Sequence, residues 1–202
     1  MAEREQEEIM NRNLQTGKLT FMGVMLALTV VFVAMTAIPT TSASMALFIF
    51  LPTMVTSIVQ GPKDGAIMGF LAGGVTLLRA LLAPASPLDY LFINPLVSIL
   101  PRIFVGVVPY FVYVIFEKLI KSKTISLFIA GASGALTNTA LVILMLYFIY
   151  SEEIVRLSTE FGIGTTFAAF AIFLVTTSSL LECTAAGIGT TAVVNVYKRI
   201  KK

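Results

Sequence analysis

The sequence of 202 residues has no histidine, no tryptophan and one cysteine, Cys183, and charged residues make up only 12% of it. A soluble globular domain has about 25% charged residues, so this composition excludes that class. The lack of cysteine pairs and of histidine also excludes disulfides, imidazole acid–base catalysis and metal clusters based on these residues. We therefore expect a protein that is not an enzyme, with no catalytic residue, metal or cofactor.

Hydrophobic residues make up 57% of the chain and gather in six long stretches. A bilayer core of about 30 Å takes about 20 residues per helix, so six crossings would need about 120 residues and leave no room for a second soluble domain. The stretches cover residues 19–38, 45–60, 64–83, 94–116, 125–150 and 163–196. The second is short for a complete crossing. We predict an all-α integral membrane protein with a six-helix transmembrane bundle.

The first 18 residues mix glutamates with basic side chains and lack the basic tip, short apolar run and cleavage site of a secretory signal. We expect them to form a retained cytoplasmic tail. The predicted organisation is thus a tail over residues 1–18, a membrane domain over 19–197 and a short basic C-terminus over 198–202.

The positions of the lysines and arginines predict the orientation of the bundle. If the N-terminus is cytoplasmic, eleven of the 14 cations fall in inner segments and only Arg156 falls in an outer one, while Arg79 and Arg102 lie within apolar stretches. Cytoplasmic loops of membrane proteins carry an excess of lysine and arginine. Both termini are therefore expected in the cytoplasm.

Small residues recur four positions apart in three of the predicted helices. They are Gly23 and Ala27 in the first, Gly65, Gly69 and Gly73 in the third, and Ala130 and Gly134 in the fifth. Such stripes let another helix approach closely, which favours helix association in lipid. We expect internal packing for the third and fifth helices, whereas the first stripe could equally face another subunit.

The fourth predicted helix begins with a capping residue, Asn94, followed by a first-turn proline, Pro95. Further along, Pro101 has no N–H to donate to the carbonyl of Val97, and this bends the helix. Membrane helices tolerate such breaks where other groups satisfy the freed backbone. Arg102 follows directly, about 12 Å from Asn94 along the helix axis.

A guanidinium at the depth of Arg102 is costly, by about 3 to more than 10 kcal/mol. One alternative is that Arg102 pairs with Glu182, the only acid deep within an apolar stretch; the other, which we prefer, is that it binds an anionic ligand. Hydroxyls precede Glu182 at residues 176–179, and Ser178 lies four positions before it, although such hydroxyls often bond to their own backbone.

Other polar residues extend this candidate site. Asn138 places an amide near mid-membrane, as a ligand contact or as a helix–helix contact. Arg79 and Tyr90 flank the third connection, and Arg79 is close enough to the outer end to extend to the interface. Ligand pockets often form between helices, so the predicted substrate-binding set is Asn94, Arg102, Asn138 and Glu182, with Tyr90 and Arg79.

No segment has the G-x-x-x-x-G-K-[ST] spacing of an ATP-binding loop, because QGPKDG at residues 60–65 lacks both the spacing and the final hydroxyl residue. The chain therefore cannot drive transport with ATP by itself. Its two halves also show no visible inverted repeat of the kind found in secondary transporters.

Three sequence segments and one late glutamate carry a resemblance to a known family. They are QGPKDGAIMGFLAG at 60–73, NPLVSILPRIFVGVVPYFVY at 94–113, GALTNTALVI at 134–143, and the glutamate of LLECTAAG. Through them the membrane region resembles the substrate-binding S components of energy-coupling factor (ECF) vitamin transporters. The phrases are most similar to those of pantothenate-specific members, while members for hydroxymethylpyrimidine, folate and riboflavin share the same plan.

The resemblance implies a six-helix protein of the bacterial plasma membrane that captures a vitamin from outside. It would then topple in the bilayer and dock on a transmembrane coupling subunit that carries two ATPases, with no nucleic acid as partner. In the family an alanine, three residues and an alanine on the first helix contact the coupling subunit. Gly23 and Ala27 match this motif, with glycine in place of the first alanine.

For pantothenate, Arg102 would bind the carboxylate through paired hydrogen bonds, and Asn138 and Asn94 would bind the hydroxyl and amide groups. A neutral or cationic pyrimidine would instead favour Glu182, and a folate or flavin would require several aromatic residues, for which Tyr90, Phe92 and Tyr147 are the candidates. A membrane-embedded enzyme and a purely structural subunit are the alternatives outside transport.

Overall fold

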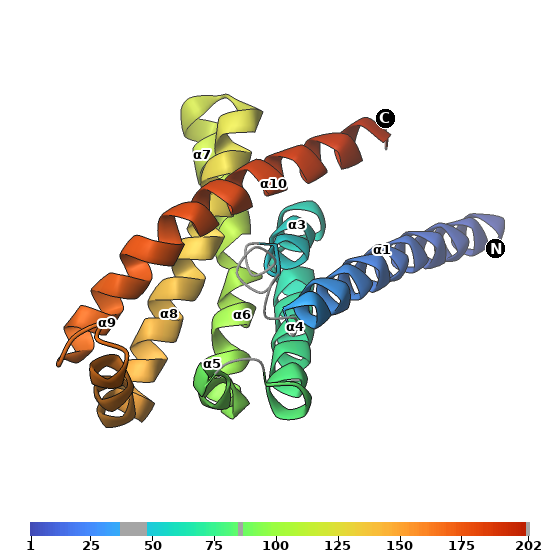
Figure 1. Ribbon diagram of the computed structural model, residues 1–202. Coiled ribbons are helices and arrows are strands. Elements are labelled where there is room, and N and C mark those ends of the chain that lie inside the picture. The colour runs from blue at the N-terminus through green and yellow to red at the C-terminus, as the bar shows by residue number, and fades with distance from the viewer. Residues whose placement is uncertain (37–47, 85–86, 201–202) are drawn as a thin grey trace.

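A computed structural model describes residues 1–36, 48–84 and 87–200, and within these ranges it contains helices and no strand. Figure 1 shows the arrangement of the elements. In chain order they are α1 (Ala2–Met35), α3 (Leu51–Gln60), α4 (Pro62–Leu82), the 3-10 helix η1 (Pro87–Ile93), α5 (Pro95–Ser98), α6 (Leu100–Val105), α7 (Val108–Ile120), α8 (Lys123–Glu160), α9 (Phe167–Leu174), the π-helix η2 (Val175–Ser179) and α10 (Leu180–Ile200).

Five stretches of the described residues are helical, long and apolar enough to cross a membrane. They are Gln15–Met35, Pro62–Leu82, Pro95–Ile120, Lys123–Glu160 and Phe167–Ile200. They correspond to five of the six predicted helices, which confirms the all-helical class. The remaining prediction, 45–60, lies partly outside the described residues, and α3 has only 10 residues, about 15 Å of helix. A sixth crossing stays a prediction.

The predicted N-terminal tail is part of a longer helix. α1 begins at Ala2 and continues without a break to Met35, so residues 2–18 of the predicted tail and residues 19–35 of the first apolar stretch form one helix. Thr36 closes this helix, since its Oγ1 donates to the carbonyl of Val33 at 2.7 Å.

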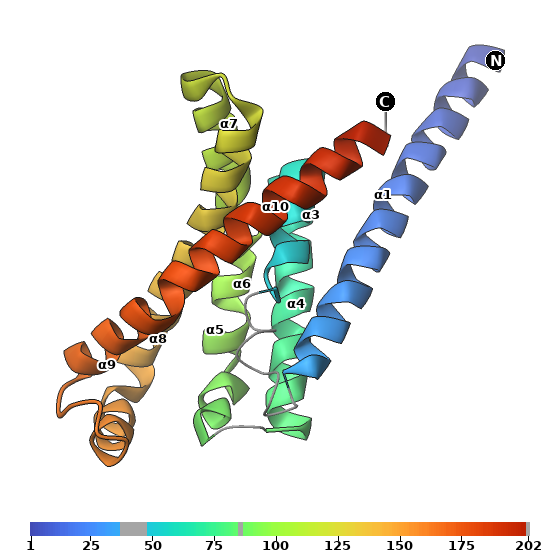
Figure 2. The same cartoon turned by 45° about the horizontal axis from the view of Figure 1, so that its top comes forward.

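The helices alternate in direction. Figure 2 shows both chain termini toward the end of the bundle that carries the α3–α4 and α7–α8 connections, while α5 and the α8–α9 connection lie at the opposite end. This is the arrangement that the charge pattern predicts, because the lysine-rich connections and both termini share one side. Which side faces the cytoplasm stays a prediction of the positive-inside rule.

Prolines divide the span Pro95–Ile120 into three short helices. Pro95, Pro101 and Pro109 each lie in the first turn of a helix, of α5, α6 and α7 respectively. A first-turn proline fits because its missing N–H would have no intrahelical partner there. The helix is interrupted at Ile99, between α5 and α6, two residues before Pro101.

The glycine stripe of α4 packs inside the bundle, as predicted. A Cβ at Gly65 would overlap the carbonyl oxygen of Gly106, one at Gly69 would overlap that of Arg102, and one at Gly73 would approach Ile99. The backbone of α6 therefore lies directly against α4. The stripe of α8 is also internal, because Ala130 is fully buried and Gly134 faces Met54 and Pro109.

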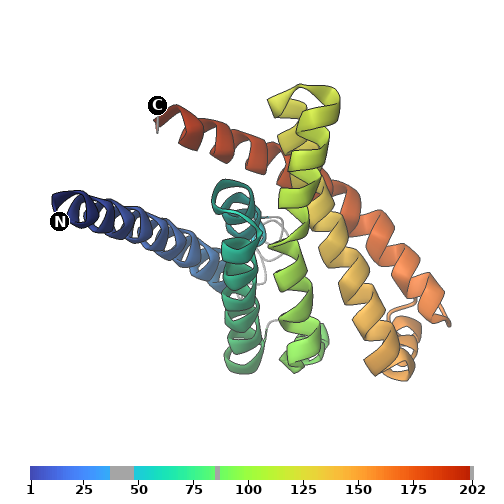
Figure 3. The same cartoon turned by 180° about the vertical axis from the view of Figure 1, so that it is seen from behind.

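The stripe of α1 differs from the other two. Gly23 and Ala27 are both exposed, and a Cβ at Gly23 would meet no atom within 4 Å. α1 lies at the edge of the bundle, as the view from behind in Figure 3 shows. Lys18 fixes it there, since its carbonyl accepts a hydrogen bond from Gln60 at 3.1 Å and its ammonium is 3.6 Å from Asp64.

We expect Gly69→Ala to destabilise the protein and Gly74→Ala to leave it intact. The added methyl at Gly69 would overlap the backbone of α6, whereas a Cβ at Gly74 would meet no atom within 4 Å. Overpacking of this kind costs about 1–3 kcal/mol. Thermal unfolding of both variants in detergent measures the difference, and equal midpoints would contradict the close approach of α4 and α6.

The predicted orientation can be tested with cysteines in a Cys183→Ser background. Lys118 lies in the last turn of α7 and Glu160 is the last residue of α8, and both are exposed. The α7–α8 and α8–α9 connections that follow them lie at opposite ends of the bundle (Figure 2). With the termini in the cytoplasm, a membrane-impermeant maleimide added to intact cells should label Glu160→Cys and should label Lys118→Cys only after permeabilisation. The reverse pattern would invert the topology.

Candidate functional site

Two of the three apolar clusters in the described part of the bundle border a polar layer. The central cluster contains the buried residues Met54, Val105, Ala135 and Ala186, with Phe50 and Cys183 packed against it. The distal cluster lies toward η1 and contains Leu91, Val97, Val142, Leu146, Ile154 and Phe170. Because these clusters share the long helices, the residues between them on each helix occupy a common level.

Three predicted site residues fall in this interval. Arg102 lies between Val97 of the distal cluster and Val105 of the central cluster. Asn138 on α8 and Glu182 on α10 likewise lie between a member of one cluster and a member of the other. By their order along the helices the three residues fall between members of the same two clusters, and we call this interval the polar layer.

Arg102 satisfies the backbone that its neighbouring proline leaves without a donor. Its side chain is buried, and Nη1 donates to the carbonyl of Val97 at 3.0 Å. This is the carbonyl that would otherwise receive the N–H that Pro101 lacks. The guanidinium therefore has a structural role in the helix break that the spacing of Val97, Pro101 and Arg102 could have indicated.

Two phenyl rings contact the same guanidinium. The carbon Cζ of Arg102 is 5.5 Å from the ring centroid of Phe50 and 5.5 Å from that of Phe92. Within the described residues, the Nε of Arg102 is buried and has no hydrogen-bond partner. An unpaired donor of this kind, in a charged group, is costly in a protein interior.

Glu182 lies near Arg102 without forming a close ion pair. The two charges interact electrostatically, and Thr139 donates a hydrogen bond to the carboxylate of Glu182. The ion pairs within 4.0 Å among the described residues join Lys18 with Asp64, Arg79 with Asp89 and Arg156 with Glu153. Arg102 is thus only partly compensated, and direct pairing with Glu182 does not account for its burial.

Asn138 and Ser179 add unpaired polar atoms to the polar layer. Asn138 is 8% exposed and its Oδ1 has no hydrogen-bond partner among the described residues; the same holds for the Oγ of Ser179, which is 4% exposed. The structure therefore does not use the Asn138 oxygen in a helix–helix contact. Ser178, expected to share a face with Glu182, has a side chain outside the described set.

Asn94 has a local role at the start of α5. Its Oδ1 accepts a hydrogen bond from the backbone N–H of Leu96 at 3.0 Å, which confirms the predicted cap. This contact uses one lone pair of the side-chain oxygen, and the amide nitrogen of Asn94 is not needed for the cap.

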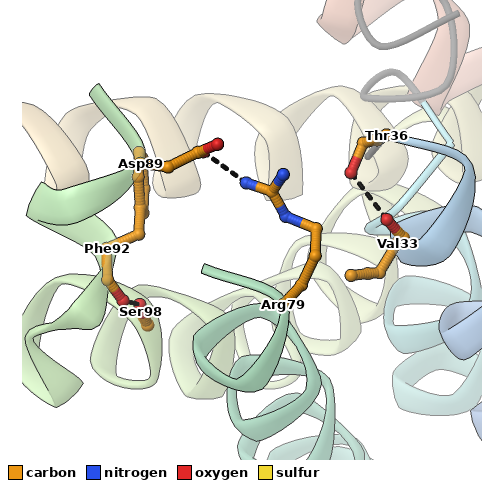
Figure 4. Close-up of polar contacts among 6 residues, drawn as sticks. All are labelled: Val33, Thr36, Arg79, Asp89, Phe92 and Ser98. Atoms are coloured by element: carbon orange, nitrogen blue, oxygen red, sulfur yellow. Dashed lines mark hydrogen bonds and ion pairs between the residues drawn. The ribbon is translucent and has the colours of Figure 1, made fainter. Parts of the chain in front are cut away.

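Arg79 and Tyr90 belong to a second network at the η1 end. Arg79 forms an ion pair with Asp89 of η1, and its side chain is only 13% exposed (Figure 4). Tyr90 donates to Glu153 on α8 at 3.1 Å. Burial, followed by the hydrogen bond and charge of Glu153, raises the pKa of Tyr90 and keeps its phenol protonated as a donor.

Two contacts of these residues, those of Thr139 and Phe50, were not predicted from the sequence. Thr139 directly follows Asn138, which was a usable signal, whereas nothing in the sequence brings Phe50 to Arg102. Of the aromatic candidates, Phe92 contacts Arg102, while Tyr147 packs against Phe148 and Phe167 at centroid distances of 5.6 and 5.1 Å.

Comparison with known proteins gives consistent matches. The family described as "ECF transporter, substrate-specific component" matches residues 17–194. The pantothenic acid transporter PanT of Lactococcus lactis subsp. cremoris is 28% identical over 158 residues, 71% of this chain and 73% of that protein. The pantothenate transporter PanT of Leuconostoc mesenteroides is 32% identical over 96 residues, 45% of this chain and 46% of that protein.

Proposed function

The chain belongs to the family of substrate-specific components of ECF transporters, and from this premise we propose that it binds pantothenate and delivers it to the other subunits of an importer. It is a membrane protein of a transport family, and the named relatives support uptake of a vitamin. The observation that carries the ligand assignment is the buried Nε of Arg102, a charged donor without a hydrogen-bond partner among the described residues.

The chemistry of the polar layer fits that of pantothenate. A carboxylate binds arginine through two parallel hydrogen bonds, and Arg102 has an unused donor for one of them. The free oxygen of Asn138 can accept from a hydroxyl or an amide N–H, both of which pantothenate carries. Two apolar clusters border the layer, so little water competes for these groups.

The outer contacts of the site are Asn94, Tyr90 and Arg79. The amide nitrogen of Asn94 can donate to the ligand while its oxygen caps α5. Arg79 and Tyr90 hold η1 at the open end, so we assign them to the rim of the site. Glu182, with its Thr139 contact, balances part of the charge of Arg102 when no ligand is bound.

A second candidate is the same kind of subunit for another vitamin. Hydroxymethylpyrimidine would use Glu182 as its main contact, and folate or riboflavin would stack on aromatic rings, of which Phe50 and Phe92 are the two at Arg102. An enzyme or a purely structural subunit is a remote alternative, because neither requires the unpaired atoms of Arg102 and Asn138.

The partners that we propose are a transmembrane coupling subunit and two ATPases, in the bacterial plasma membrane, with both termini of this chain in the cytoplasm. The exposed stripe of Gly23 and Ala27 on α1 is the proposed docking surface for the coupling subunit. The stripes of α4 and α8 are buried within the chain, which leaves the α1 stripe available for a partner helix.

Replacing Arg102 should abolish tight binding of pantothenate. Removing one partner of a buried charge pair costs about 2 kcal/mol or more, so Arg102→Gln should weaken binding about 30-fold or more. Equilibrium binding of radiolabelled pantothenate to the purified protein measures this, with hydroxymethylpyrimidine, folate and riboflavin as competitors. Arg156→Gln is the control, because Arg156 is exposed and pairs with Glu153.

Two results would contradict the assignment. Loss of folding in Arg102→Gln together with unchanged affinity of the folded fraction would indicate a structural role alone. If hydroxymethylpyrimidine displaced pantothenate and Glu182→Gln weakened binding, the acid and not the arginine would be the main contact.

For pantothenate, Glu182→Gln should keep or increase the affinity, because it removes a negative charge near the ligand carboxylate.

Gly23→Leu should leave vitamin binding unchanged and prevent uptake. The new side chain meets no atom of this chain within 4 Å of its Cβ, but it fills the surface on which we expect a partner helix to pack. Binding to the purified subunit, copurification with the coupling subunit and ATP-driven uptake into liposomes measure the three effects.

Gly74→Leu is the matched control, since Gly74 also has open space at its Cβ but lies on α4. This variant should bind pantothenate, copurify with the coupling subunit and support uptake.

The unmodified subunit alone in liposomes should bind pantothenate without accumulating it. Normal uptake by Gly23→Leu would exclude the α1 stripe as the docking surface, and uptake by the subunit alone would exclude the dependence on ATPases.

A further inference from the structure

The guanidinium of Arg102 has two distinguishable edges. Nη1 lies on the edge that donates to the carbonyl of Val97 at 3.0 Å. Nε lies on the other edge and has no hydrogen-bond partner among the described residues. A guanidinium is planar and rigid, so the contact that holds one edge also fixes the direction of the other.

Two aromatic residues hold the plane of this group. The rings of Phe50 and Phe92 both lie 5.5 Å from the Cζ of Arg102, within the range of a cation–π contact. They come from different parts of the chain, Phe50 from the residue before α3 and Phe92 from η1. Phenyl rings offer the cation a face without adding a polar group that would compete for its N–H donors.

We propose that Phe50 and Phe92 are positioning residues that, with the Val97 carbonyl, hold Arg102 so that its Nε edge receives a carboxylate of the ligand side-on. The inference rests on the proposed function, because it requires an anionic ligand at Arg102. It adds to that function the edge of the arginine that binds and the two residues that orient it.

The place of Phe92 is itself fixed by several contacts of η1. The Oγ of Ser98 donates to the Phe92 carbonyl, and the neighbouring Asp89 pairs with Arg79 at the end of α4, as Figure 4 shows. On the other side, Tyr90 donates to Glu153 of α8 at 3.1 Å. η1 is thus attached to α4, α5 and α8, and these attachments hold the ring of Phe92 over Arg102.

In this arrangement Arg79 and Tyr90 affect the affinity for the ligand indirectly. Neither needs to touch the ligand to affect its affinity, because both hold the segment that carries Phe92. The two rings also cover a charge that lies in the polar layer between two apolar clusters. They favour the charged guanidinium where water is scarce.

Phe92→Leu tests the proposal with two ligands that differ in charge. Pantothenol is the alcohol analogue of pantothenate and has no carboxylate for Arg102 to bind. We expect Phe92→Leu to weaken pantothenate binding about tenfold and to change pantothenol binding less than about twofold. Phe92→Tyr should retain pantothenate binding, because it keeps an aromatic ring at this position. Phe104→Leu is the matched control, because Phe104 lies two residues after Arg102 and is 43% exposed.

The outcomes separate the positioning role from folding and from the proposed function. Equal weakening for both ligands, or no weakening for either, would overturn the positioning role. If Phe92→Leu does not fold, Phe50→Leu tests the second ring with the same two ligands and the same expectations. If Arg102→Gln also binds pantothenate normally, the proposed function fails; if only the phenylalanine variants bind normally, Arg102 binds the ligand without their help.

Discussion

The structure depends on how one interrupted helix satisfies its backbone within the membrane. Pro101 cannot donate to the carbonyl of Val97, and lipid offers no water to replace the missing donor. Arg102 supplies the donor from its own side chain, so the charge is anchored to the helix break by a hydrogen bond of 3.0 Å. The same residue thus completes the backbone and keeps part of its guanidinium unpaired.

The depth and direction of that side chain follow from the packing of α4 against α6. Gly69 lies against the carbonyl of Arg102, and Gly65 lies against Gly106, so the two backbones meet without side chains between them. Because this contact is between main chains, it leaves α6 little freedom to slide or rotate. The position of Arg102 relative to Asn138 and Glu182 is then set by the apolar clusters above and below the polar layer.

Much of this architecture is predictable from the sequence, and the part that is not has a physical reason. Hydropathy locates the long helices, and local rules locate the Asn94 cap and a helix break near Pro101. The ion pair of Arg79 with Asp89 and the contact of Phe50 with Arg102 depend on how η1 and the start of α3 pack against the rest of the bundle. A π-helix, Val175–Ser179, directly precedes α10, and such a local change of helical register is not foreseen by a spacing rule.

The three small-residue stripes show where sequence spacing stops being informative. In α4 and α8 the stripe is filled by another part of the chain, whereas Gly23 and Ala27 of α1 face outward. Lipid covers exposed apolar side chains such as Val24 and Leu28 at no cost, so exposure alone does not indicate a partner. A groove of small residues is different, because flexible lipid tails fill it less well than a rigid helix does. That difference is the physical reason for proposing a second protein, and not lipid, as the partner of the α1 stripe.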